Sequence, residues 1–384
     1  MIIYLNFIIP ILAILILSIV FHKNVNILER IIVFAVAAIV IIVAKVLSVV
    51  GQTSTPECLN SYAVQAFYYE DWDEWVEKTC TRCVRRDSTG CVEEEEYDCS
   101  YREYYPPYWE IQDNVGKTYG VPESKYRHLL QLWGGKAIFK DLHRDYYHDD
   151  GDLWYVMYDN KFEHTYPIVR RGTYENRVKC SRSIFNFKTI TPQEKSMYGL
   201  YDYPQMDRYD YNPILGFKDY KASKRLSFHN AHLGSFKQVH MLIAVYKNKP
   251  YDAALYQESL WKGGNKNEFI LCIGVNDENQ IQWAKVISWT EVQELKIGLE
   301  SKVKKMSFDL SAIADTMAKD VQYRFKRKQF KDFSYITVEP TTTAVILSFV
   351  ITFIVTVILS IVVIKYEISF DGINTHLKRG GKMS

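Results

Sequence analysis

The side chains best suited to covalent chemistry are cysteines, because four of the seven in the chain lie close together: Cys80, Cys83, Cys91 and Cys99. The first two have half the spacing of a zinc site, but the last two are eight positions apart and supply no second half. We therefore predict disulfides in a hairpin over Thr79–Cys99, whose turn at 86–90 brings Cys83 near Cys91. Spacing leaves the full pairing open, and Cys58 could pair with one of the four.

Three carboxylates form a second candidate site, this time for a metal ion. Asp252 follows one predicted strand, and Asp277 and Glu278 follow the next. Ligand sites of α/β sheets form beyond the carboxyl ends of parallel strands, and carboxylate oxygens suit Ca²⁺ or Mg²⁺. The alternative is that Asp252 caps a helix while the other two are ordinary turn residues. The run His143–Asp152 also holds histidines and carboxylates, but its spacing is typical of a solvated loop.

Three apolar runs indicate that the chain is a membrane protein. Residues 2–21 and 341–364 carry no charge, and residues 31–50 carry only Lys45. Each run has about the 20 residues that a helix needs to cross a hydrocarbon core of about 30 Å. We therefore predict three transmembrane helices and a large domain between the second and the third.

The flanking charges predict the orientation. The loop His22–Arg30 and the tail 365–384 are basic, and short basic segments favour the cytoplasm. Residues 51–340 are then periplasmic or extracellular, and the density of cysteines also suits an oxidising compartment. The alternative that residues 2–21 are a cleaved signal peptide lacks a basic start and a small-residue cleavage site.

Charge excludes one class of partner and describes a surface. The net charge of +2 gives no basis for nucleic-acid binding. Fifteen acidic against five basic residues between Glu57 and Asp113 predict an acidic surface. The sequence holds no glycine-rich phosphate loop, serine elbow or HExxH helix.

The fold class predicted is α+β, with a mixed sheet near the C-terminus. A helix at Lys218–Leu233 precedes apolar strands at Gln238–Tyr246 and Glu268–Val275, and Cys272 is expected as a buried thiol. The turn Asn276–Asn279 and a strand at Ile281–Ser288 complete a hairpin. The predicted order is helices in 1–50, a cysteine-rich acidic hairpin region at 51–113, an irregular aromatic-rich region at 114–212, an α/β domain at 213–335, a third span at 341–364 and a cytoplasmic tail at 365–384.

The α/β domain resembles a TPM domain, a small fold of membrane-tethered extracytoplasmic proteins. The resemblance rests on the strand Val239–Val245, the step Leu260-Trp261-Lys262-Gly263-Gly264, the strand after it and the closing segment Phe325–Phe330. The order of parts is similar to that in uncharacterised membrane proteins of tailed bacteriophages, which implies a host or bacterial inner membrane. The resemblance implies phosphatase activity, divalent-cation binding or assembly of membrane complexes, and fold alone selects none of these.

Two functions follow as hypotheses. The first is a non-enzymatic membrane protein whose outer domain binds a membrane or envelope protein, with the acidic hairpin as a contact surface. The second is a metal-dependent hydrolase of the phosphatase kind, in which Asp252, Asp277 and Glu278 hold the ion.

Overall fold

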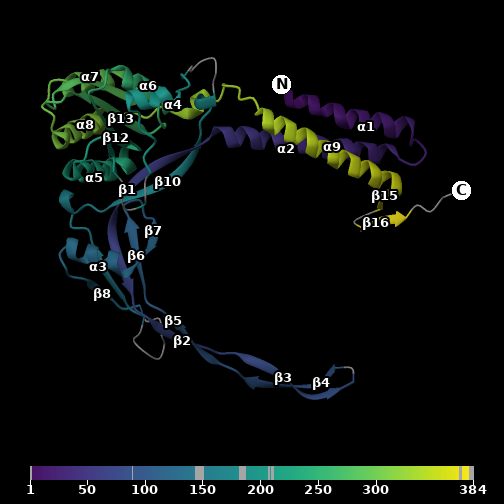
Figure 1. The fold of residues 1–384 in the computed structure, drawn as a ribbon. Coiled ribbons are helices and arrows are strands. Elements are labelled where there is room, and N and C mark those ends of the chain that lie inside the picture. Colours follow the sequence, from purple (N-terminus) through teal and green to yellow (C-terminus); the bar gives the residue numbers. More distant parts are fainter. Residues whose placement is uncertain are drawn as a thin grey trace. The chain divides into compact units, whose positions relative to one another are not determined.

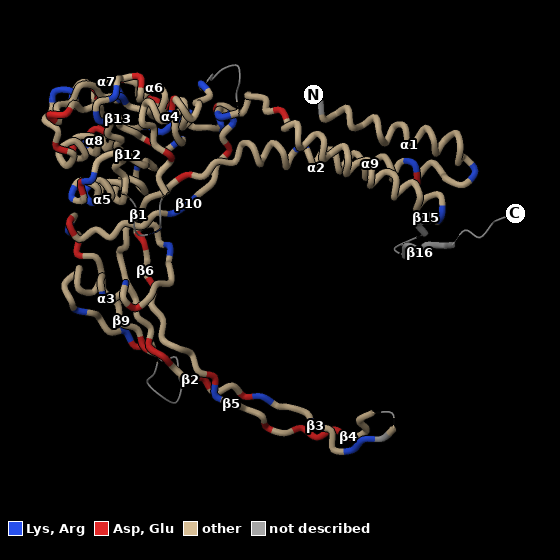
Figure 2. Tube along the Cα trace, viewed as in Figure 1, with Lys and Arg blue, Asp and Glu red and all other residues tan. Residues whose placement is uncertain are grey.

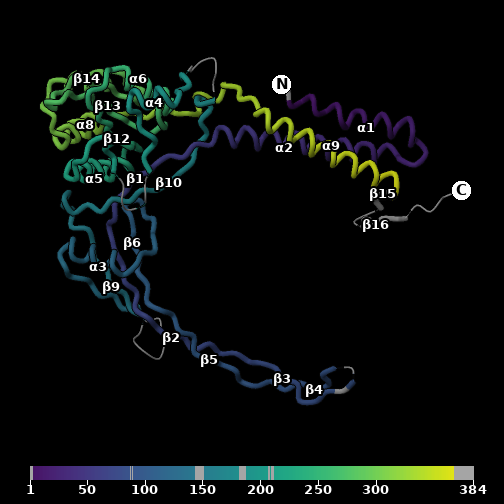
Figure 3. The backbone as a smooth tube through the Cα atoms, in the orientation of Figure 1, coloured from purple at the N-terminus to yellow at the C-terminus, as the bar shows by residue number. Residues whose placement is uncertain are grey.

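A computed structural model describes residues 2–88, 90–142, 151–180, 187–205, 208, 212–371 and 374–379. The chain mixes helices and sheets, as predicted, and divides into two compact units (Figure 3). The first unit comprises Met1–Pro56, Thr173–Asn186 and Gln329–Ser384, and the second comprises Glu57–Gly172 and Phe187–Lys328.

The first unit contains two helices long and apolar enough to cross a membrane, among the residues that the structure describes. These are α2 (Ile27–Thr53) and α9 (Thr342–Lys365), which lie along each other (Figure 1). The same unit holds the short helices η3 (Val178–Cys180) and η4 (Phe330–Phe333) and the strands β15 (Tyr366–Asp371) and β16 (Asn374–Arg379), which pair with each other.

The prediction of three full-length spans is wrong for the first run. It starts as a 3₁₀ helix, η1 (Ile2–Phe7), and continues as α1 (Ile8–Ile19), which has only 12 residues. Pro10 has no N–H to donate to the carbonyl of Asn6, so a regular α-helix is favoured only from the residues just before it. The apolar helical run as a whole, Ile3–Ile19, is shorter than the roughly 20 residues of a typical spanning helix.

The two long helices bury matching faces. Helix α9 buries Ser348, Thr352 and Thr356, and α2 buries Val33, Ala37 and Ile41, each set spaced by four residues. Small side chains at this spacing let two helix backbones approach closely in lipid. Lys45, the charged residue of the apolar run 31–50 in α2, donates to the hydroxyl of Tyr4 at 2.5 Å.

The second unit contains the predicted mixed sheet in the order β11-β12-β13-β14. Strands β12 (His240–Lys247) and β13 (Glu268–Val275) are parallel, and β14 (Ile281–Ser288) runs antiparallel to β13. All eight residues of β13 are buried, as in sheets covered by helices on both faces. Strand β11 (Ile214–Leu215) lies beside β12. The covering helices are α5 (Tyr220–Lys237), α6 (Asp252–Leu260), α7 (Gln293–Val303) and α8 (Leu310–Arg324).

A six-stranded sheet forms the rest of the body of this unit. Its central strand, β1 (Ser54–Tyr69), pairs with β6 (Tyr108–Asp113) on one side and β9 (Leu153–Met157) on the other. The predicted regions 51–113 and 114–212 therefore share one sheet and one core. The remaining elements are β7 (Thr118–Val121), β8 (Ile138–Lys140), β10 (Pro167–Glu175), α3 (Glu123–Leu132), α4 (Pro192–Tyr198) and η2 (Phe162–His164).

Candidate functional site

The feature that stands out from the body of the second unit is a two-stranded arm, residues 70–107. It begins and ends beside the pair Tyr69 and Tyr108, where β1 and β6 stop pairing. Strands β2 (Trp72–Val76) and β5 (Tyr101–Tyr105) form its base, and β3 (Thr79–Asp87) and β4 (Gly90–Asp98) form its outer half (Figure 1). At about 3.3 Å per residue, such an arm reaches roughly 50 Å.

Two disulfides join the strands of the arm. Cys80 bonds Cys99 where the two ladders meet, and Cys83 bonds Cys91 near the tip. A two-stranded ladder has no core of its own and is marginal in water, so the covalent links compensate for missing hydrophobic burial. The disulfides predicted for this cluster are present, and the buried Cys58 takes part in neither.

The arm is acidic, with twelve acidic against five basic residues and a net charge of −7 (Figure 2). Arg82 lies opposite Glu95 and forms an ion pair with it at 2.8 Å. Glu94 and Glu96 lie opposite Cys83 and Thr81 instead, so no base faces them across the ladder. All nine residues of β4 are exposed, which leaves these carboxylates available to a partner.

Aromatic side chains accompany the carboxylates on the arm. Trp75 is 49% exposed and Tyr104 is 59% exposed, although both are large enough to bury in a core. The ring of Trp72 stacks on Tyr105 with centroids 4.5 Å apart. Desolvation and a hydrogen bond to Glu74 raise the pKa of Tyr105 to about 12, so its hydroxyl stays protonated. The arm thus offers rigid aromatic area beside negative charge.

The structure does not assemble the three predicted metal ligands into a site. Asp277 accepts a hydrogen bond from Asn248 at 2.8 Å and pairs with Lys247, and both contacts lower the pKa of its carboxyl. Glu278 lies in the same turn. No three His, Cys, Asp or Glu side chains among the described residues lie close enough together to hold an ion.

Asp252 is not the helix cap that the alternative interpretation predicted. The cap of α6 is Tyr251, and Asp252 is the first residue of the helix. A carboxylate in the first turn still gains from the helix dipole. In the other candidate run, residues 143–150 lie outside those described, and buried Asp152 accepts a hydrogen bond from the N–H of Leu142.

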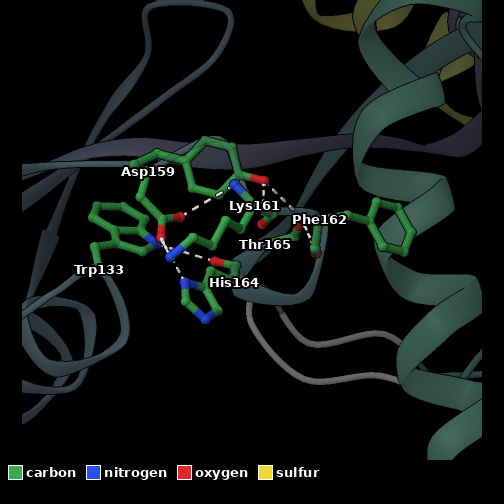
Figure 4. A network of polar contacts seen from close by, with 7 residues as sticks. Trp133, Asp159, Lys161, Phe162, His164 and Thr165 are labelled. Carbon is green, nitrogen blue, oxygen red and sulfur yellow. Dashed lines mark hydrogen bonds and ion pairs between the residues drawn. The ribbon is translucent and has the colours of Figure 1, made fainter.

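A polar network around η2 is a feature that the sequence did not indicate (Figure 4). Asp159 accepts from Nδ1 of His164 at 2.7 Å and from the N–H of Lys161. Burial alone would raise the pKa of Asp159, but these hydrogen bonds outweigh it and lower that pKa overall. The indole of Trp133 donates to the carbonyl of His164 at 3.0 Å. The network therefore holds η2 in one conformation.

This ordered loop packs on α5 through Phe162. Its ring stacks on His232 and lies against His229, with centroids 5.5 and 4.9 Å apart. The Thr165 hydroxyl donates to the carbonyl of Phe162, so Nε2 of His232 must donate to Thr165. Burial lowers the pKa of both histidines, even though Asp315 accepts from His229 at 2.8 Å.

A second buried network joins the start of β1 to the amino ends of β12 and β13. The hydroxyl of Tyr203 donates to Glu268, and Asn267 donates to the carbonyl of Cys58. Burial raises the pKa of Glu268 and raises that of Cys58 to about 12. A thiol with such a pKa is a poor nucleophile, so this network supports the fold rather than covalent chemistry.

Comparison with protein-family models, with curated proteins and with solved structures found no match for this chain. The resemblance of the mixed-sheet region to TPM domains, and that of the order of parts to phage membrane proteins, therefore stay predictions.

Proposed function

We propose that the chain is an integral membrane protein that binds a membrane or envelope protein through the arm. The observation that carries the proposal is the arm itself, a disulfide-joined ladder with exposed aromatic and acidic side chains outside any core. The proposed activity is recognition, not catalysis.

The long apolar helices support the membrane part of the proposal. If α2 and α9 both span, the residues between them, 54–341, lie on one side of the bilayer. The basic residues near the start of α2 and after α9 favour the cytoplasm, which places the arm outside. The two disulfides fit this assignment because they persist in oxidising compartments.

The composition of the arm supports protein recognition. Exposed tryptophan and tyrosine supply large contact areas at low cost in side-chain entropy, and they are enriched among the residues that dominate binding energy. Disulfides hold the ladder in shape before binding and so reduce the ordering cost. A net charge of −7 attracts basic surfaces and repels acidic ones. The partner expected is a protein that presents a basic, aromatic-accepting surface.

Removal of the arm tests this proposal without disturbing the sheet. Tyr69 and Tyr108 are directly paired, so an Asn-Gly turn can join them in place of residues 70–107. The full chain and this variant would be tagged, expressed in the same cells and purified with their membrane partners. We expect the partner to be lost and the melting temperature to stay within a few degrees. If a folded variant without the arm retained the same partners, the proposal would be wrong.

A specific observation for the hydrolase alternative is lacking among the described residues. Asp252, Asp277 and Glu278 form no group that could hold an ion there. We therefore do not propose a phosphatase activity.

A further inference from the structure

The second unit contains a cavity of about 500 Å³ that the arm does not use. It lies between α3, the segment from Glu163 to Pro167, and the first turns of α5. Small-molecule sites in proteins are concave, have volumes of about 300–1,000 Å³ and combine apolar walls with a few polar groups. The cavity has this size and composition, and the side chains that line it determine which ligand it would bind.

The side chains of α5 that face the cavity include two small ones, which leave space for it. Ser223 and Ser227 line it at a spacing of four residues, where a helix facing a packed core usually carries large apolar residues. Their hydroxyls are already used, since Ser227 donates to the carbonyl of Ser223 and Ser223 donates to Asn212. These serines are small, so they leave space in the cavity. Their hydroxyl hydrogens are already donated within the protein and are not needed to bind a ligand.

Charged groups of both signs line the cavity from different elements. Lys218 precedes α5 and Lys224 lies on its second turn, whereas Glu163 comes from η2. Among the described residues these three form no ion pair with one another or with any other side chain. The other carboxylate, Asp219, caps α5 by accepting from the N–H of Ala222 at 2.9 Å. The cavity thus holds available positive and negative charge at separate places.

One part of the lining is apolar. Leu132 comes from α3, Pro167 from the start of β10 and Phe228 from α5. The ammonium of Lys224 lies 5.4 Å from the centroid of the Phe228 ring, which positions a charge at the edge of this apolar wall. A ligand side chain on this wall would be removed from water while its charged ends met the lysines and Glu163.

We propose that this cavity binds a zwitterion of the amino-acid or short-peptide class. Its carboxylate would pair with Lys218 and Lys224, its ammonium with Glu163, and its side chain would pack on the apolar wall. A simple anion would be repelled by Glu163 and a simple cation by the two lysines, so ligands with both charges are selected. This inference is independent of the arm and of its partner.

The test is calorimetric titration of the full-length protein in detergent micelles with the tripeptide Ala-Leu-Ala. We expect saturable binding that weakens by roughly tenfold or more when the amino end is acetylated or the carboxyl end amidated, because each loses a charge-assisted contact. Glu163→Gln should remove the effect of acetylation. Lys218→Met with Lys224→Met should remove the effect of amidation, because both lysines line the cavity. Lys237→Met is the matched control, since Lys237 lies at the other end of α5 and does not line the cavity.

Ser227→Leu provides a steric test, because the leucine side chain would occupy the cavity. Binding of the tripeptide should be lost while the melting temperature is unchanged or raised. The proposal is overturned if the tripeptide does not bind, if both blocked peptides bind as well as the free one, or if the folded Ser227→Leu protein binds normally.

Discussion

Asn60 and His240 lie 2.8 Å apart in the interior of the second unit, joining β1 to the first residue of β12. The amide Nδ2 of Asn60 is a donor only, so Nδ1 of His240 accepts and the ring is neutral. Burial lowers the pKa of His240 to about 3. This contact therefore makes the attachment of the two sheets sensitive to acid.

Stability should fall below about pH 6.5, because the unfolded chain binds a proton at His240 that the folded chain binds only near pH 3. A lowered folded-state pKa means that the stabilisation is complete above the unfolded value and is lost as the pH falls. The expected slope is about 1.4 kcal/mol per pH unit for this group. His229 and His232, whose pKa values are also lowered, add in the same direction.

Urea unfolding of wild type and His240→Gln between pH 7 and 5 measures this contribution. The difference between the two slopes should correspond to about one proton. The raised pKa of Glu268 acts with the opposite sign, but it is common to both proteins and cancels in the difference. Equal slopes would show that His240 titrates normally in the folded state.

Gly234 and Gly298 provide a matched pair of substitutions in helices. A Cβ on Gly234 would lie 2.6 Å from the backbone oxygen of Asn60, so Gly234→Ala must push α5 from β1. We expect a loss of about 1–3 kcal/mol in unfolding free energy. Gly298→Ala in α7 meets nothing closer than 3.6 Å and should stabilise by about 0.5–1 kcal/mol. Chemical unfolding measures the change in unfolding free energy for both variants. If Gly234→Ala stabilised the protein, the close approach of Gly234 to Asn60 would be contradicted.

The disulfide Cys83–Cys91 should act locally on the arm. Replacement of both cysteines by serine removes a constraint worth about 2–3 kcal/mol for a loop of this length, but only within a segment that has no core. Trypsin should then cleave faster after Arg82, Arg85 and Arg86, while the melting temperature changes by no more than a few degrees. A large drop in melting temperature would mean that the tip contributes to the fold of the body.

The packing of α9 on α2 predicts an asymmetry between two faces of α9. Thr352 is fully buried and Phe353 is 53% exposed. Thr352→Leu should overpack the helix contact and destabilise the helical unit by about 1–3 kcal/mol. Phe353→Leu on the outer face should stay within about 0.5 kcal/mol. Thermal unfolding of both variants in the same detergent measures the two effects. Equal effects would contradict the packing of the Thr352 face of α9 against α2.

Strong local patterns made part of the fold predictable. The apolar runs of β12 and β13 and the turn Asn276–Asn279 can each be recognised from a few adjacent residues. The cysteine hairpin was predictable for the same reason, since a turn and flanking cysteines define one another.

Features that depend on distant residues were not predictable. Strand β1 draws its partners from positions as far apart as Ile111 and Val156, and its sequence lacks a clean polar alternation. The packing of Phe162 against His232 likewise joins two segments whose sequences carry no sign of each other. The first apolar run was misread locally, because its composition does not show the effect of Pro10 on helix geometry.

Photo-crosslinking in living cells can show directly whether the arm binds a membrane or envelope protein. A benzophenone amino acid would replace Trp75 on the arm and, as the control, Tyr323, which is 72% exposed on α8. We expect a discrete crosslink from position 75 to a membrane or envelope protein, and none to the same protein from position 323. Crosslinking to that protein from position 323 alone, or from neither position, would contradict recognition by the arm.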